Sequence, residues 1–208
     1  MSLSFGFERE VPDIKDALRE AEKHNVLVLA ACGNFGSFRG WSWPARHPTV
    51  VGLYAADGYG NSYTRNPTPL KDTPRFATLG VAVAGYSLLG TLDLYSGTSV
   101  ATPIAAGIVG TLIHFMRQYK EDYLAAACYL GRGYTVQAGS AKTPSNSMRD
   151  RYEELVLKLT TRTGICLIFS EMVVDREGYR VLQPQKLFEE KGEGVHLVEV
   201  ILRVLARI

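Results

Sequence analysis

The residues best suited to chemistry lie near the middle of the chain, where the sequence reads Gly-Thr-Ser-Val-Ala-Thr-Pro over residues 97–103. Apolar positions beyond Ser99 recur at helical spacing, which predicts that the Ser99 hydroxyl lies at the N-terminus of a helix. Free backbone N–H groups and the helix dipole favour developing negative charge there, and Gly97 permits close approach of a substrate backbone. The pattern favours a serine nucleophile, whereas an isolated Gly-Thr-Ser would only indicate that Ser99 or Thr98 caps the helix.

Two other segments carry candidate binding residues. Asn34 follows the apolar run 26–31, which is typical of a strand buried on both faces of a parallel sheet, and open α/β sheets bind ligands just past such strand ends. A carboxamide there can stabilise the oxyanion of acyl transfer; the alternative is a loop residue that closes a turn with Gly33 and Gly36. The segment 2–6, Ser-Leu-Ser-Phe-Gly, suits a strand lying beside an extended peptide, or is an ordinary edge strand.

The elements that must position these residues alternate between strands and helices up to about residue 116. A helix is expected at 12–23, where Pro12 stands at the start, and a second one follows Ser99. Strands are expected at 2–7, 26–31, 49–56, 76–79 and 81–84. This alternation predicts an α/β fold with a doubly wound, mostly parallel sheet.

The tail, residues 117–208, carries no motif that indicates chemistry. Its pattern predicts an α+β extension that covers apolar surface of the main body, residues 1–116. The expected pieces are a helical stretch at 123–129, a Gly-rich segment around 131–133, a linker at 141–146, an amphipathic helix at 148–159, a β-like run at 165–174, a turn at 175–178 and a helix at 195–206.

Composition narrows the functional classes. The 23 Lys and Arg nearly balance the 21 Asp and Glu, so we expect no nucleic-acid partner. The three cysteines fit neither a disulfide framework nor a zinc site, and we expect no metal and no cofactor. The longest unbroken apolar run, 26–32, is too short to cross a bilayer, so no membrane partner is expected. Charged residues at 8–10 replace the apolar core of a secretory signal, which favours an intracellular protein.

Six segments in order resemble the subtilisin-like serine peptidases (the peptidase S8 family) between about Ser2 and Met116. They are Ser-x-Gly at 4–6, Ala-x-Gly-Asn at 31–34, Trp-Pro-Ala at 43–45, the run 50–57, Phe-Ala-x-x-Gly at 76–80 and Gly-Thr-Ser-x-Ala-x-Pro at 97–103. The resemblance implies a sheet of the subtilase type and a serine-type endopeptidase that acts on polypeptides. It does not extend to the tail.

Carried over residue by residue, the resemblance implies that Ser99 is the acylated nucleophile. Asn34, together with the backbone N–H of Ser99, resembles the donors of the oxyanion hole. The segments that resemble the peptide-binding walls comprise Ser4, Phe5, Gly6, Ala30, Ala31, Cys32 and Gly33. Many relatives bind calcium, and the sequence leaves that question open.

The catalytic Asp and His of the family are missing from this sequence. The family order is Asp, His, Ser, so both should precede the Ser4 strand. None of His24, His47, His114 and His196 stands in the family's context, and a serine without its imidazole is a poor nucleophile. The chain is therefore expected to be an N-terminally truncated subtilase core.

Three interpretations follow from the missing residues. The chain is part of a peptidase whose full-length form is active, or an inactive remnant that binds peptides or a partner, or it receives the Asp and His from a second chain. A Gly-x-Ser-x-Gly esterase is a weak alternative, because the last position of that motif is Ala101.

Overall fold

The computed structural model describes residues 1–69, 73–129, 143–189 and 194–208. Its main sheet has six strands in the order β1 (Ser2–Leu3), β2 (Leu29–Ala31), β3 (Val51–Ala56), β4 (Phe76–Leu79), β8 (Tyr179–Leu182) and β7 (Val173–Arg176). Neighbours from β1 to β8 pair in parallel, and β7 pairs antiparallel with β8. The predicted mostly parallel α/β sheet is confirmed.

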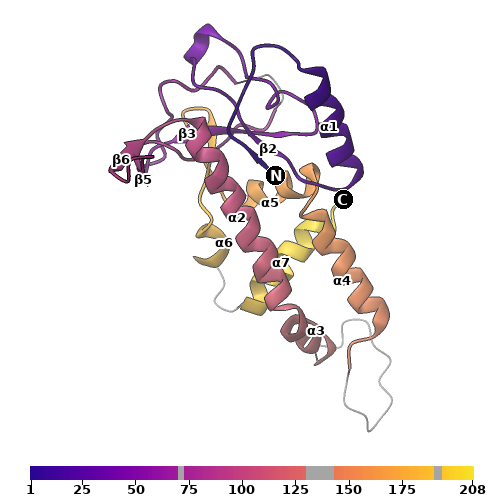
Figure 1. The fold of residues 1–208 in the computed structure, drawn as a ribbon. Coiled ribbons are helices and arrows are strands. Elements are labelled where there is room, and N and C mark those ends of the chain that lie inside the picture. The colour runs from indigo at the N-terminus through magenta and orange to yellow at the C-terminus, as the bar shows by residue number, and fades with distance from the viewer. Residues whose placement is uncertain (70–72, 130–142, 190–193) are drawn as a thin grey trace.

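Helices and loops cover both faces of this sheet, as doubly wound topology requires (Figure 1). All six residues of β3 are buried, because successive side chains enter opposite layers. Leu53 packs with α2 (Thr98–Gln118) and helices of the tail. Tyr54 packs on the other face, with Leu18 of α1 (Pro12–Lys23) and Trp41.

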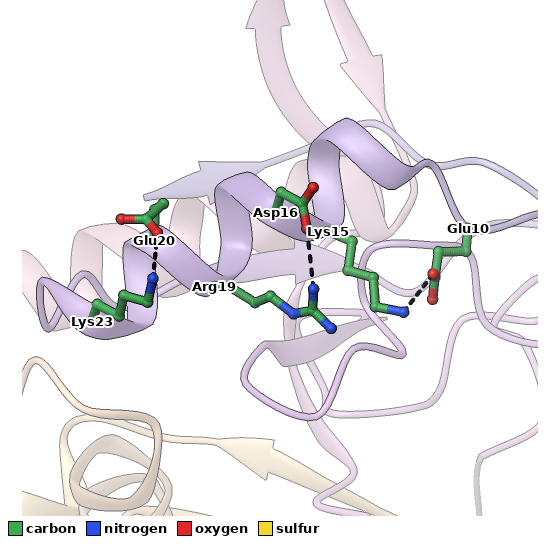
Figure 2. Close-up of polar contacts among 6 residues, drawn as sticks. All are labelled: Glu10, Lys15, Asp16, Arg19, Glu20 and Lys23. Atoms are coloured by element: carbon green, nitrogen blue, oxygen red, sulfur yellow. Dashed lines mark hydrogen bonds and ion pairs between the residues drawn. The ribbon is translucent and has the colours of Figure 1, made fainter.

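Helix α1 has the predicted bounds and presents a charged face to solvent. Pro12 opens it, Asp13 lies in its first turn and Lys23 in its last, all favourable positions. Its ion pairs are Lys15–Glu10 at 2.6 Å, Arg19–Asp16 at 3.1 Å and Lys23–Glu20 at 2.6 Å (Figure 2). Such exposed pairs contribute about 0–1 kcal/mol each, so burial of Leu18 is what fixes α1 on the sheet.

Helix α2 lies close against the strands because the residues between them are small. A Cβ placed on Gly80 would lie 2.8 Å from the Ala55 Cβ and 2.9 Å from the Ala101 Cβ. The helix is long and apolar enough to cross a membrane by length and composition. One side of it, which includes Ala105, Leu112 and Met116, is buried in the core shared with the sheet, as in the core helix of a globular protein.

The tail contains more helix than its sequence predicted. The expectation of a β-like run at 165–174 is wrong, because α5 (Arg162–Glu171) occupies most of it and β7 begins only at Val173. Thr161 caps α5 by accepting from Gly164 N at 3.1 Å. The other tail helices are α3 (Lys120–Tyr129), α4 (Asn146–Lys158), α6 (Lys186–Glu189) and α7 (Gly194–Leu205). The Gly-rich segment 131–133 and the start of the linker lie outside the described residues.

Strand β8 of the tail pairs directly with β4 of the main body. The register sets Phe76 opposite Arg180 and Ala77 opposite Val181. The tail therefore extends the main sheet as well as covering it, while the division at residue 116 stays a prediction.

A separate antiparallel hairpin precedes α2 and projects from the sheet (Figure 1). It comprises β5 (Val83–Tyr86) and β6 (Leu92–Tyr95), whereas the sequence predicted one strand at 81–84. All four residues of β6 are exposed. The large apolar side chains exposed on this hairpin are Tyr86, Leu88, Leu89, Leu92, Leu94 and Tyr95.

Candidate active site

The site forms where the loop after β2 meets the N-terminus of α2. Gly97 has φ 144°, a region that favours glycine, and its N–H donates to the Gly80 carbonyl at 2.7 Å. The Asn34 Oδ1 accepts from the Thr98 N–H at 2.8 Å, and the Thr98 Oγ1 accepts from the Gly33 N–H at 3.1 Å. These bonds join the two segments that sequence analysis singled out, at the carboxyl edge of the parallel strands.

The orientation of the Asn34 amide leaves its donor end free. Since Oδ1 accepts from Thr98, the Nδ2 group keeps two N–H donors, and within the described part of the chain it bonds to nothing. Ser99 is the second residue of α2, so its own N–H has no intrahelical acceptor. An oxyanion hole requires two such donors aimed at one point, and these roles for Ser99 and Asn34 stay predictions.

A reciprocal pair of hydrogen bonds fixes Ser99 to Ser4. The Ser99 hydroxyl donates to the Ser4 carbonyl at 3.0 Å, and the Ser4 hydroxyl donates to the Ser99 carbonyl at 2.8 Å. Sequence analysis treated Ser4 only as part of a peptide-binding wall and missed this contact. A backbone carbonyl cannot accept the proton itself, so this geometry holds the hydroxyl without activating it.

The two predicted peptide-binding walls differ in what they expose. Ser4, Phe5 and Gly6 are exposed. In the other wall the side chains of Ala30, Ala31 and Cys32 are buried, and Gly33 is half-buried. A peptide could therefore meet that second wall only through its backbone and through Gly33. Burial also raises the pKa of the Cys32 thiol well above its ordinary value, which makes that thiol unreactive.

The histidines whose side chains are described lie elsewhere in the fold. His24 ends α1, with Nδ1 2.9 Å from the Glu20 carbonyl oxygen. His47 is buried against Trp43, with Nδ1 2.8 Å from the Thr49 Oγ1.

The remaining two histidines belong to helices. His114 lies fifteen residues beyond Ser99 in α2, which is about 22 Å along the axis. His196 belongs to α7, and its side chain lies outside the described residues. Among the described residues the hydrogen-bond acceptor of the Ser99 hydroxyl is the Ser4 carbonyl and not an imidazole.

The family is decided by a match over more than half of the chain. The model of the subtilase family (Peptidase_S8) matches residues 1–129 of the 208. The chain belongs to the subtilase family. It is 26% identical over 127 residues to the subtilisin-like protease het-Q2 of Podospora anserina. That alignment covers 57% of this chain and 35% of that protein. It is also 26% identical over 131 residues to the major intracellular serine protease of Bacillus subtilis (strain 168). This second alignment covers 59% of this chain and 38% of that protein.

Solved structures with this fold include two maturation proteases. The structure of the patellamide maturation protease PatA aligns with a TM-score of 0.56 at 19% identity, over 96% of this chain and 62% of that one. The prenylagaramide maturation protease PagA aligns with a TM-score of 0.52 at 22% identity, over 77% and 61%. These likenesses show the fold, and the PatA alignment includes the tail. The chain spans little more than a third of the length of the two curated relatives described above.

Proposed function

We propose that this chain is the nucleophile-bearing part of a subtilase that hydrolyses peptide bonds, and that its Asp and His come from another segment. The observation that supports it is the Asn34 amide, whose Oδ1 accepts from the Thr98 N–H beside Ser99, so that among the described residues its Nδ2 donors stay available for a ligand. The family consists of serine endopeptidases, so the substrates would be polypeptides.

The chemistry assigned to these residues follows from their positions. The Ser99 Oγ attacks the peptide carbonyl carbon while its proton passes to the imidazole supplied by the other segment. The Asn34 Nδ2 and the Ser99 N–H then donate to the oxygen that becomes negative. The imidazole returns the proton to the leaving amine, and water hydrolyses the acyl-Ser99 ester. Before attack, the Ser99 hydroxyl must leave the Ser4 carbonyl.

A second candidate is a catalytically inactive module that binds extended peptides or a partner. The bond from the Ser99 hydroxyl to the Ser4 carbonyl favours it, because that arrangement persists without a base. The exposed segment at residues 4–6, just after β1, would bind the peptide in either case.

Acylation of Ser99 separates the two candidates. The coding sequence upstream of Met1 is examined for an Asp-Thr-Gly and a His-Gly-Thr, and that segment is co-expressed with the chain. A fluorophosphonate probe should label the chain weakly alone, since loss of triad members that act as a unit costs on the order of 10⁶ in turnover.

Co-expression should restore labelling, and Ser99→Ala should abolish it. Ser37→Ala, at an exposed serine, is the matched control. Vigorous labelling of the chain alone would refute the requirement for a second segment. Labelling that stays weak on co-expression would favour the binding module.

A further inference from the structure

The wall that carries Ser4 continues into an open cleft of about 550 Å³. Gly6 and Ser42 both line it, and a Cβ on Gly6 would come within 2.6 Å of the Ser42 Cβ. A Cβ on Gly33 would come equally close to the Ser42 Oγ. The cleft therefore adjoins both glycines of the predicted peptide-binding walls, and a side chain of a peptide bound there has this space to enter.

Positive charge exceeds negative charge along the cleft. Its lining includes Glu8, Arg39 and Arg46. Arg39 forms an ion pair with Glu8, in which both side chains are more than half exposed. Arg46 donates through Nη2 to the Glu8 backbone carbonyl and, within the described ranges, pairs with no carboxylate. Two guanidinium groups and one carboxylate leave one positive charge in excess.

The geometry of Arg46 leaves donors available for a ligand. A guanidinium carries five N–H donors in a planar fork that matches a carboxylate, and one donor is committed to the Glu8 carbonyl. The Arg39 guanidinium also stacks over the Phe35 ring, at 4.8 Å from its centroid. Phe7, Phe35 and Trp41 give the same cleft an aromatic wall, against which methylene groups of an acidic side chain can pack.

We propose that this cleft binds an acidic side chain, Asp or Glu, of the polypeptide substrate, and that Arg46 determines this specificity. The inference rests on the proposed function only in taking the bound peptide as the substrate. A basic side chain would meet the excess positive charge, and a neutral one would offer the guanidinium groups no charged acceptor. Glu8 moderates the preference, because its carboxylate competes for Arg39.

The test measures binding of fluorescein-labelled octapeptides by anisotropy, using the whole chain carrying Ser99→Ala so that acylation plays no part. The peptides are alanine- and leucine-based and carry a single Glu, Gln or Lys, moved through each position. At the best position Glu should bind about 3- to 10-fold more tightly than the isosteric Gln, the range expected for a charge-assisted contact that is partly exposed. Raising NaCl from 50 to 500 mM should shrink the difference.

Variants identify the residue responsible. Arg46→Gln should remove most of the Glu preference, and Arg46→Glu should reverse it in favour of Lys. Glu8→Gln should increase the preference for Glu peptides. Arg19→Gln, at an arginine on α1 outside the cleft, is the matched control and should change nothing. Circular dichroism checks that each variant folds. The salt series on the Ser99→Ala chain tests the charge preference without any change to the cleft.

Equal binding of Glu and Gln peptides at every position would overturn the cleft assignment. So would preference for Lys in the parent chain, or absence of binding by all peptides. These outcomes leave Ser99 labelling unaffected. Conversely, failed labelling together with a persistent Glu preference would overturn the peptidase proposal alone.

Discussion

Replacing Gly97 by alanine is expected to destabilise the chain and to displace the Asn34 amide. Gly97 has φ 144°, and a Cβ there would lie 2.8 Å from the Asn34 Nδ2 and 3.2 Å from its Cγ. Backbone strain of this kind costs about 1–3 kcal/mol for a residue with a side chain. Moving Asn34 also breaks its bond to the Thr98 N–H, worth about 0.5–1.5 kcal/mol. The free energy of unfolding should therefore fall by about 1.5–4.5 kcal/mol.

Urea unfolding followed by circular dichroism measures this change. Gly107→Ala is the matched control, because Gly107 lies in α2, the helix that begins just after Gly97, and a Cβ there meets nothing within 4 Å. That substitution should instead stabilise the chain by about 0.5–1 kcal/mol. Unfolding of Gly97→Ala at the parent midpoint, or above it, would refute the assigned conformation of Gly97 and the contact with Asn34.

Three further predictions concern the site, the surface and pH. In the co-expressed form, Asn34→Ala should slow labelling about 10²–10³-fold, a magnitude taken from subtilisin, while Asn61→Ala in an exposed loop should leave the rate unchanged. The chain alone should associate, because its hairpin exposes large apolar side chains, and Leu88→Asp with Leu92→Asp should shift it towards monomer in sedimentation; a parent chain that sediments as a monomer would contradict this. Burial lowers the pKa of His47, so the unfolded chain binds its proton more readily and stability should fall as pH drops below about 6.5. The difference in urea midpoint between pH 7.5 and 5.5 should be smaller in His47→Gln than in the parent chain. An unchanged difference would contradict this role of His47.

The parts of the fold that the sequence predicted best are those with an unambiguous local pattern. Helix α1 and strand β4 have the bounds that their patterns indicate. The prediction for the run that forms α5 was wrong because its local pattern is ambiguous. Its apolar residues 165–169 have no clear period, and a short apolar run fits a buried strand as well as a buried helix. The available signal was Thr161, an N-cap residue placed just before the run.

Contacts between distant segments could not be predicted from local pattern. The reciprocal bonds of Ser4 and Ser99 join residues 95 apart in the chain. The cleft charge depends likewise on Glu8, from the loop before α1, meeting Arg39 and Arg46, from the connection between β2 and β3. Sequence resemblance indicated the nucleophile and the amide, but their mutual orientation depends on the bond from Thr98 N to Asn34, which only the fold provides.

The pairing of β8 with β4 has a consequence for the order in which the chain folds during synthesis. Ala77 of β4 cannot pair with Val181 of β8 until Val181 has been made. About a hundred more residues must therefore leave the ribosome before the sheet is complete. At about 5–20 residues per second that delay is roughly 5–20 s. The apolar side of α2 gains its partners from α4 and α5 only late in that interval, and its partners from α7 only after Val181 has been made. The nascent chain is therefore most exposed to chaperones and proteases after α2 has been made and before its last two strands have emerged.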